Sequence, residues 1–270
     1  MSIINKIRDK VTEPGMKKID INGSDRIVAE REILFSKKLM VYVLKELYKA
    51  CMDLGEKYFT AEGLNVEIGA GSSMVKHYYP NVITTDIVPS PYIDKILNAQ
   101  NMDFEDSSIR MIFGKDCFHH FSQPKLFLKE LNRVLKPEGG CILVEPYHGF
   151  FASLIFTYLH EPDRECFDKN QKRWDSNKDK ASPMSGANQA LSYIVFVRDK
   201  ELFKKKFPSL EIVKILPLKN YLQYLLSGGV TFKQLVPDFI IPGIKFLEWI
   251  LSPLVNKLAI HYIIVLRKII

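Results

Sequence analysis

The sequence is poor in cysteine and contains no long uninterrupted hydrophobic run. Its four cysteines lie far apart, at positions 51, 117, 141 and 166, and no two of them form a C-x-x-C pair. This spacing favours neither a metal site nor a disulfide framework, and it suits a reducing cytoplasm. The first residues meet a charge every few positions, so no secretory signal is expected.

The most apolar segment, residues 235–270, is interrupted by charged residues before about 18 apolar positions accumulate, so it is not expected to span a bilayer. The net charge of +7 is concentrated in the same quarter, where residues 198–270 carry 12 Lys or Arg against 5 Asp or Glu. This excess predicts attraction to an acidic lipid surface or a phosphate-bearing substrate, with a solvated basic face as the alternative. Because no aromatic-studded basic ridge accompanies the charge, nucleic acid is not an expected partner.

Hydrophobic periodicity divides the chain of 270 residues into two parts. Residues 1–60 repeat apolar positions at three-to-four spacing, which predicts a helical extension or lid. Residues 61–270 alternate short apolar runs with helical stretches, which predicts a parallel sheet with helices on both sides. The candidate strands are 65–68, 82–85, 93–97, 111–113, 141–145, 210–215 and 259–266, and the clearest helices are 124–135 and 198–207.

Two insertions interrupt this second part, at 160–190 and 217–258. The first contains a polar stretch, 163–186, that is predicted to be a loop or lid. The second is rich in Pro and Gly, which predicts short helices and turns in an apolar insertion before the last strand. The apolar residues of the C-terminal quarter could cover the sheet, form a homodimer contact or lie against a membrane.

A glycine-containing run, Glu67-Ile68-Gly69-Ala70-Gly71-Ser72-Ser73, follows the first predicted strand. Glycine at 69 and 71 lets the backbone approach a ligand, and the N-terminus of a following helix would present free N–H groups. A dinucleotide-binding fold would place a third glycine at position 74, where Met74 stands. This substitution argues against a nucleotide-dependent oxidoreductase, which we keep as an alternative.

Two acidic residues accompany the glycines: Glu67, and Asp86 at the end of the second predicted strand. A carboxylate at that position can accept both hydroxyls of a ribose. Further runs follow along the chain, namely Asn98-Ala99-Gln100-Asn101-Met102-Asp103-Phe104, His119-His120-Phe121 and 131–146, the last containing Lys136-Pro137-Glu138-Gly139-Gly140. Over residues 62–160 these motifs resemble the class I S-adenosylmethionine-dependent methyltransferases with a type 11 methyltransferase domain.

The resemblance implies an α/β fold with a seven-stranded, Rossmann-like, doubly wound sheet. Its strand order would be 3-2-1-4-5-7-6 with the last strand antiparallel, together with the helical N-terminal extension and the apolar insertion before the last strand. A tight turn at 136–140 would end the helix before the fifth strand. The cofactor would be S-adenosylmethionine, the product S-adenosylhomocysteine, and no metal would be required.

The resemblance also implies a cofactor site. Glu67 would organise the amino group of the cofactor, Gly69 and Gly71 its methionine part, and Asp86 its ribose. The remaining cofactor-binding residues would be Asn98, Ala99 and Met102 around the adenine, with Ala70, Ile87, Asp116 and Cys117 beside them. Asn98 stands where the family usually has Asp, and Asp103 where it usually has Pro, so weaker binding is expected.

Methyl transfer to an oxygen needs a group that removes a proton. The candidates near the carboxyl ends of the strands are Asp116, His119, His120, Glu145 and His148. We favour the three histidines because the pKa of imidazole lies near neutrality. A structural role for each of them is the alternative.

Beyond residue 147, runs such as Gly186-Ala187-Asn188 and Gly228-Gly229 resemble an uncharacterised bacterial subfamily linked to cell-surface glycan and lipid biosynthesis. The expected function is therefore methyl transfer to an oxygen, in preference to nitrogen, of a small-molecule or glycan- or lipid-linked acceptor. The protein would be cytoplasmic, with peripheral contact to the inner face of the membrane as one option. A non-catalytic S-adenosylmethionine-binding regulatory or scaffold protein is the main alternative.

Overall fold

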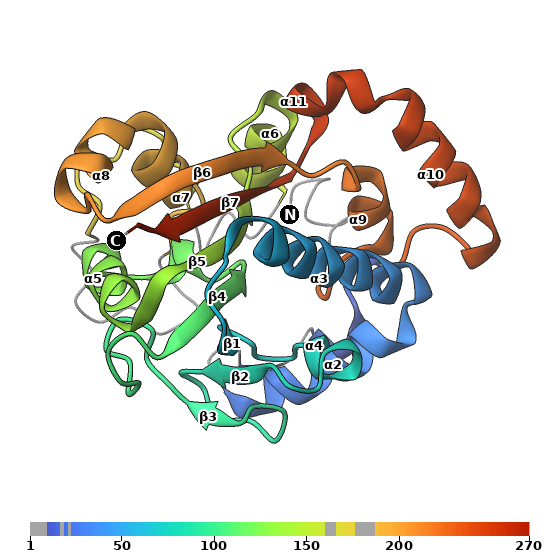
Figure 1. Cartoon of the computed structure of the whole chain (residues 1–270). Coiled ribbons are helices and arrows are strands. Elements are labelled where there is room, and N and C mark those ends of the chain that lie inside the picture. Colours follow the sequence, from blue (N-terminus) through green and yellow to red (C-terminus); the bar gives the residue numbers. More distant parts are fainter. Residues whose placement is uncertain (1–9, 17–18, 21–22, 160–165, 176–186, 270) are drawn as a thin grey trace.

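The computed structural model describes the chain except residues 1–9, 17–18, 21–22, 160–165, 176–186 and 270. Its centre is one seven-stranded sheet of order β3-β2-β1-β4-β5-β7-β6 (Figure 1). The strands are β1 Leu64–Ile68, β2 Ile83–Asp86, β3 Lys95–Ile96, β4 Ile109–Lys115, β5 Leu135–Pro146, β6 Leu210–Pro217 and β7 His261–Lys268. Neighbours among β1 to β5 run parallel, whereas β7 is antiparallel to both β5 and β6. The predicted fold class, strand order and antiparallel last strand are confirmed.

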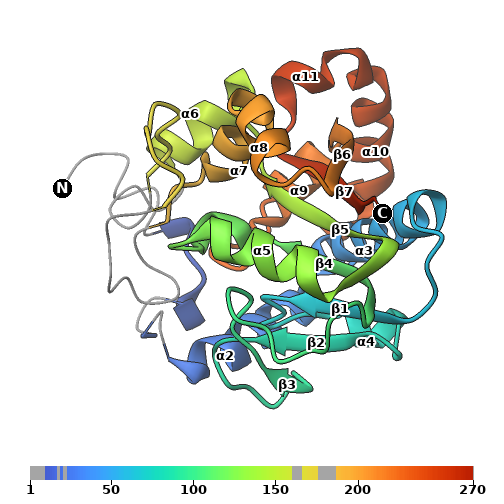
Figure 2. The ribbon, with the colours of Figure 1, turned by 60° about the vertical axis from the view of Figure 1, so that its left-hand side comes forward.

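Side chains alternate between the two faces of the sheet, as the period of two in a strand requires. On β7, Tyr262 and Ile264 join one buried cluster, and Ile263 and Val265 join the other. The first cluster lies under α5 (Pro124–Val134), α7 (Leu191–Tyr193), η3 (Ile194–Arg198) and α8 (Lys200–Lys206). The second lies under α3 (Lys38–Tyr58) and α4 (Val75–Tyr78). Figures 1 and 2 show α3 and α5 on opposite faces of the sheet.

Further helices lie beside these layers. Before α3 come η1 (Pro14–Met16) and α2 (Ser24–Ser36). After β5 comes α6 (Phe150–Tyr158), and between β6 and β7 come α9 (Tyr221–Ser227), η4 (Asp238–Ile240), α10 (Ile241–Ile250), η5 (Ser252–Leu254) and α11 (Val255–Leu258). In Figure 1, α10 forms an outer rim, away from the sheet. The short helices expected between 217 and 258 are therefore present.

Three local expectations are corrected. The third strand has two residues rather than the five predicted at 93–97. The helix after the glycine run has four residues and begins only at Val75, so it is too short to provide a helix-terminal anion site. The predicted turn at 136–140 is an irregularity within β5: Ile109 pairs with Leu135 and Met111 with Gly140, which leaves residues 136–139 outside the ladder.

The polar insertion is only partly described, because residues 163–165 and 176–186 lie outside the described chain. Within the described part, Trp174 is 2% exposed and its indole N–H donates to Asp199 at 2.9 Å. Cys166 pairs with Asn188 in an isolated bridge. Cys166 and Trp174 thus tie residues 166–175 to the domain.

Candidate active site

The glycine run lies at the carboxyl end of β1, and its two glycines have different surroundings. Both have positive φ, +62° at Gly69 and +45° at Gly71, a conformation that glycine adopts without steric cost. A Cβ at Gly69 would stand 2.6 Å from the Cβ of Cys117, so packing against the β4 loop requires glycine there. Among the described residues, a Cβ at Gly71 would meet only Asp86 Oδ2, at 3.6 Å. Gly71 therefore faces open space beside Asp86, where a ligand can approach the backbone.

Asp86 is the last residue of β2, and its carboxylate contacts the glycine run. Its Oδ2 accepts the N–H of Gly71 at 2.8 Å, and its Oδ1 accepts the N–H of Val88 at 2.8 Å. Burial raises the pKa of Asp86, and these backbone N–H groups oppose that shift. Each carboxylate oxygen can accept a second hydrogen bond, so the group can still bind a vicinal diol. Of the other predicted cofactor residues here, Ala70 is buried and Ile87 is exposed.

Glu67 is more deeply buried than the sequence suggested, with 3% of its surface exposed. Its Oε2 accepts the hydroxyl of Ser73 at 2.5 Å, and Ser73 Oγ lies 3.1 Å from the hydroxyl of Tyr48 on α3. Burial raises the pKa of Glu67 to about 8. Through Ser73 and Tyr48, Glu67 therefore links the glycine run to α3. Any effect of Glu67 on a cofactor would pass through this loop or through the charge of its carboxylate.

The outer side of the same loop is held by α2. Arg31 donates to the backbone oxygens of Ser73 and Ser72, the latter at 3.4 Å, and its guanidinium lies 4.4 Å from the ring centroid of Tyr92. The motif contains no signal for this arginine. The three-to-four spacing of residues 1–60 indicated helices that would roof the site, but only the structure shows which side chain makes the contact.

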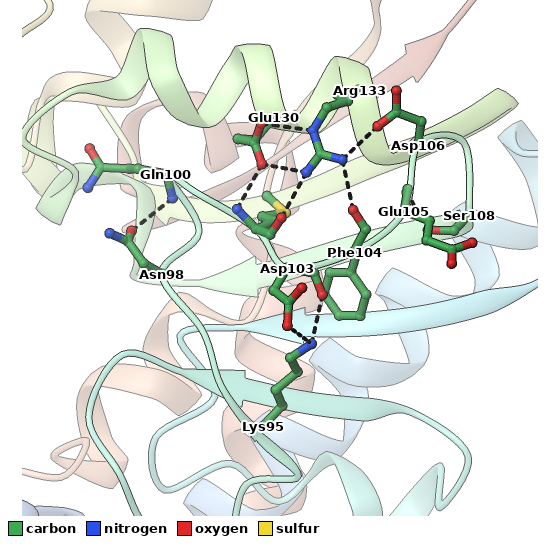
Figure 3. Close-up of polar contacts among 11 residues, drawn as sticks. Lys95, Asn98, Gln100, Asp103, Phe104, Glu105, Asp106, Ser108, Glu130 and Arg133 are labelled. Atoms are coloured by element: carbon green, nitrogen blue, oxygen red, sulfur yellow. Dashed lines mark hydrogen bonds and ion pairs between the residues drawn. The ribbon is translucent and has the colours of Figure 1, made fainter.

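The segment expected around an adenine, residues 98–104, is tied to α5 (Figure 3). Glu130 accepts the N–H of Met102 at 2.8 Å, and Arg133 donates to the carbonyl oxygen of Met102 at 2.8 Å. Met102 and Ala99 are buried in the core cluster. Asn98 is exposed, and its Oδ1 accepts the N–H of Gln100 at 2.9 Å, which makes a local turn. That oxygen retains a second lone pair for a ligand.

A fully buried carboxylate, Glu145 at the end of β5, organises the loop after β4. It accepts the backbone N–H groups of Cys117, Phe118 and His119 at 2.9 to 3.2 Å. It also lies 2.7 Å from Nδ1 of His119. The ring of His120 lies beside that of His119, with centroids 4.3 Å apart and the planes tilted by 37°. His119 is thus engaged in holding a loop, which favours its structural role over its role as a base.

Cys117 and His148 were also singled out by the sequence. Burial raises the pKa of the Cys117 thiol well above its ordinary value, so the thiol stays protonated and unreactive. Burial, with the charge of Lys169, lowers the pKa of His148 to about 4. Its ring stacks on Tyr193 with centroids 4.6 Å apart, and within the described chain its Nδ1 has no hydrogen-bond partner. His148 is therefore neutral but only weakly basic.

A second set of charged or polar side chains lies at the carboxyl end of β4. The sequence did not predict that these side chains meet. Lys115 forms an ion pair with Asp116, and Asp116 Oδ1 lies 3.2 Å from Nε2 of His261 at the start of β7. Burial by itself would raise the pKa of Asp116, but Lys115 and His261 hold it well below its ordinary value. Asp116 has φ of +51°, a conformation that a residue other than glycine adopts mainly at special sites. His261 and Lys115 carry no recognisable motif, so only the pairing of β5 with β7 reveals them.

The structure therefore gathers most of the predicted residues at one edge of the sheet. Glu67, Gly69, Gly71 and Asp86 form one group at the ends of β1 and β2, and Asp116, Cys117, His119 and Glu145 form another at the ends of β4 and β5. Met102 lies in the core instead. No cluster of three or more His, Cys, Asp or Glu side chains suited to a metal ion occurs within the described ranges.

Comparison with known proteins agrees with this arrangement. Residues 66–143, from β1 into β5, match the family model described as a methyltransferase domain. The matched residues are those that carry most of the motifs. Among curated proteins, none matches the chain at a significant level.

Solved structures show more distant likenesses. A geranyl diphosphate C-methyltransferase from Streptomyces coelicolor A3(2) is 12% identical, with 83% of this chain and 80% of that chain covered, at a TM-score of 0.45. The phosphoethanolamine N-methyltransferase 2 of Haemonchus contortus is 14% identical, with 83% and 53% covered, at a TM-score of 0.44. A putative sarcosine dimethylglycine methyltransferase from Galdieria sulphuraria is 13% identical, with 85% and 86% covered, at 0.41. The fold assignment rests on the strand order itself.

Proposed function

We propose that this chain transfers a methyl group from S-adenosylmethionine to an oxygen atom of its acceptor. The observation that carries the proposal is the open space at Gly71 beside the Asp86 carboxylate, at the carboxyl ends of β1 and β2. Ligands of doubly wound sheets bind at that edge. The methyltransferase family match, which begins at the same strand, supports the choice of cofactor.

The residues present fit this cofactor. Asp86 would accept the ribose hydroxyls, the backbone at Gly69 to Gly71 would lie along the methionine part, and Asn98 would accept a hydrogen bond from the adenine amine. Glu67 would hold the glycine loop in place from behind, through the hydroxyl of Ser73. Bound there, S-adenosylmethionine supplies a methyl group activated by its sulfonium. The chain's own part is to hold the acceptor in line, to exclude water and to accept its proton.

Two glycine variants test the cofactor site against a purely structural role. We expect Gly71→Ala to abolish most S-adenosylmethionine binding in isothermal titration, with a cost of about 1 kcal/mol in stability from the positive φ. Gly69→Ala is the matched control for stability, because its Cβ would clash with Cys117 and should cost more than Gly71→Ala. Asp86→Asn should weaken binding about tenfold or more, since one acceptor becomes a donor. Unchanged binding in both Gly71→Ala and Asp86→Asn would contradict the proposal.

The alternatives give different results in the same assay. A regulatory or scaffold protein would bind S-adenosylmethionine without releasing S-adenosylhomocysteine in the presence of any acceptor. A nucleotide-dependent oxidoreductase would bind NAD and not S-adenosylmethionine. The division into a helical extension at 1–60 and a methyltransferase domain at 61–270 belongs to the proposal, supported by the contact of Arg31 with the glycine run.

We further propose that the enzyme is cytoplasmic and works at an anionic membrane surface, which it contacts through α10. On helix α10 an acidic residue is buried and the aromatic residues are exposed. Its acid, Glu248, is buried against Gln223, whose backbone N–H it accepts at 2.9 Å. Its aromatic residues point outward, with Phe246 61% and Trp249 72% exposed, and Phe239 just before it is 81% exposed.

This exposed surface, the α10 face, comprises Leu235, Phe239, Ile240, Phe246, Leu247, Trp249, Ile250 and Leu254. A face of this kind in water indicates an interaction site. The charge of the surrounding sequence selects the partner: residues 198–270 carry 12 basic against 5 acidic residues. Exposed Trp and Phe beside lysines are typical of helices that lie in an anionic lipid interface. Other apolar residues of this region, Leu251, Val255 and Leu258, pack against the core, so only the α10 face is offered to a partner.

No helix of the described chain is both long enough and apolar enough to cross a membrane. The test of the α10 face is sedimentation of the full chain with vesicles of phosphatidylglycerol and phosphatidylcholine at low salt. We expect binding that falls when Phe246 and Trp249 are both changed to Ser, and that is weak on vesicles of phosphatidylcholine alone. Absence of vesicle binding, or a concentration-dependent dimer that the double variant disrupts, would refute the membrane proposal. A lipid-linked acceptor would then lose its main support.

A further inference from the structure

The helix that follows the glycine run is too short to hold the run in place. It has four residues and begins at Val75, so Ser72 and Ser73 lie outside it. In a helix beginning at Ser72, the carbonyl oxygen of Ser73 would accept the N–H of His77, four residues further on. Here that N–H donates to the carbonyl oxygen of Met74 at 3.0 Å instead. The carbonyl oxygens of Ser72 and Ser73 are therefore open to donors from elsewhere in the chain.

Arg31, on α2, supplies those donors. Its guanidinium donates to the carbonyl oxygens of Ser73 and Ser72, the latter at 3.4 Å. In the same turn, the hydroxyl of Tyr48 on α3 accepts the N–H of Met74 at 3.3 Å. Side chains of the N-terminal helices thus pair backbone groups that a longer helix would have paired by itself. The conformation of the glycine run therefore depends on α2 and α3.

Arg31 also contacts the loop after β2. Its guanidinium carbon lies 4.4 Å from the ring centroid of Tyr92, which belongs to the segment between β2 and β3. Asp86 joins the same two loops from within, because its carboxylate accepts the N–H groups of Gly71 and Val88. Two side chains therefore connect the loop after β1 to the loop after β2. Asp86 is the one that faces the open space at Gly71, and Arg31 braces the loops from α2.

Other charged residues of α2 lie near the same loops. Burial raises the pKa of Asp86, and the charge of Arg26 opposes that shift, which places a second basic residue of α2 near this carboxylate. Glu30 is buried and forms an ion pair with Arg26, and it accepts the hydroxyl of Ser72 at 3.4 Å. Helix α2 thus meets the edge of the sheet through polar and charged groups, which can fix a loop by direction as well as by contact.

We infer that Arg31 is a positioning residue for the cofactor, which holds the loops after β1 and β2 so that the backbone at Gly71 and the carboxylate of Asp86 face one ligand. This inference rests on the proposed function. Arg31 acts through Ser72, Ser73 and Tyr92, so it does not need to touch the sulfonium or the methyl group. S-adenosylmethionine and S-adenosylhomocysteine should therefore depend on it equally. The N-terminal helices then form part of the cofactor site.

The shape of the guanidinium explains why arginine suits this position. It is planar and carries five N–H donors in a fixed fork, so one group can meet two carbonyl oxygens and lie against an aromatic ring. A lysine ammonium is a compact charge on a flexible stem and cannot make all these contacts at once. Arg31→Lys should therefore retain part of the function, and Arg31→Met should lose it.

The test compares Arg31→Met and Arg31→Lys with the wild type in the full chain. Isothermal titration should show that both cofactor forms bind about tenfold more weakly to Arg31→Met and about threefold more weakly to Arg31→Lys, since hydrogen bonds that hold the loop are lost. Amide hydrogen exchange provides a second measurement that needs no ligand. Residues 71–75 should exchange faster in Arg31→Met than in the wild type, because the loop opens more often.

Arg198→Met is the matched control. Arg198 also donates to two backbone carbonyl oxygens, those of Lys169 at 2.7 Å and Gln171 at 2.9 Å, but it holds a segment outside the proposed cofactor site. Its loss should lower the stability of the chain. Cofactor affinity, and amide exchange at residues 71–75, should stay at the wild-type level.

Three outcomes would overturn the inference. Wild-type affinity in Arg31→Met, or in Arg31→Lys if Arg31→Met does not fold, would show that the loops need no such contact. Weaker binding with unchanged amide exchange at residues 71–75 would show that Arg31 contacts the cofactor directly and does not position the loop. An equal loss of affinity in Arg198→Met would show a general effect of stability.

Failure of the proposed function gives a different result. The wild type itself would then bind neither S-adenosylmethionine nor S-adenosylhomocysteine, and the cofactor role of Arg31 would fall with that function. Faster amide exchange in Arg31→Met would still be seen, because the contacts of Arg31 with Ser72 and Ser73 exist without a ligand.

Discussion

Two histidine–carboxylate pairs lie at the same edge of the sheet, and they differ in what surrounds the carboxylate. Glu145 accepts three backbone N–H groups in addition to His119, and it is completely buried. Asp116 instead faces Lys115 and His261, and both of these side chains line a cavity. The first pair closes a loop, whereas the second lies at the lining of a small cavity.

The comparison shows that a histidine near a carboxylate is not by itself a catalytic signal. What matters is whether the backbone occupies the other hydrogen-bonding positions of the pair or leaves them to a ligand. His119 lies in a recognisable His-His motif and is engaged by Glu145, and His261 lies in no motif and lines the cavity. The first two predictions that follow would break this comparison, and the last two would sharpen it.

The largest effect is expected at Glu145. Glu145→Ala leaves three buried N–H groups and His119 without their acceptor, and should lower the free energy of unfolding by about 3–5 kcal/mol. Urea unfolding of the purified variant measures this loss. A loss under about 1 kcal/mol would mean that the loop after β4 does not depend on this carboxylate, and the contrast between the two pairs would fail.

A third buried carboxylate, Glu67, has a hydroxyl partner and no histidine, and its stability should depend on pH. Its pKa is about 8 in the folded chain against 4.5 in a free side chain. Between these values the folded state keeps the proton that the unfolded state has released. Ionisation therefore favours unfolding, and stability falls as pH rises through that window.

Glu67→Gln removes this titration. The stability of the wild type relative to Glu67→Gln should fall by up to about 1.4 kcal/mol per pH unit across the window, and stay constant above it. Thermal unfolding of both proteins from acid to mildly alkaline pH measures the difference. A difference that does not change with pH would show that Glu67 is ionised throughout, like a carboxylate with a charged partner.

A smaller effect is expected at His119. His119→Asn removes one hydrogen bond of 2.7 Å to Glu145 while the three backbone donors remain, so the free energy of unfolding should fall by about 1–3 kcal/mol. Urea unfolding of this variant beside Glu145→Ala measures the difference. A loss as large as that of Glu145→Ala would mean that the contact with His119 accounts for most of the contribution of this carboxylate.

The smallest effect on stability is expected on the α10 face. Trp249 is 72% exposed and stacks on Phe246 with centroids 5.9 Å apart. Trp249→Ser should change the free energy of unfolding by no more than about 0.5 kcal/mol, in contrast with the buried pairs. A loss above about 2 kcal/mol would indicate that this face packs within the molecule.

Much of the fold could be predicted from local patterns. Apolar runs of strand length located six strands to within a few residues, and periodicity located the helices at α3, α5 and α8. Prediction was poorer where contacts with adjacent strands, and not the local sequence, determine the structure of a segment. Strand β3 is only Lys95 and Ile96, and residues 136–139 bulge from β5 because the ladder to β4 resumes at Gly140.

The sequence by itself predicted the proposed cofactor site, because its residues lie close together along the chain and are constrained by backbone conformation. Gly69 and Gly71 directly follow β1, and Asp86 ends β2. Their positions are therefore set as soon as these two strands form. Only the tertiary structure decided the pairing of Asp116 with His261, residues 145 positions apart. Local periodicity carries no information about contacts that arise when β7 inserts antiparallel beside β5, and the same holds for the outward turn of α10, where Glu248 is buried and Trp249 is exposed.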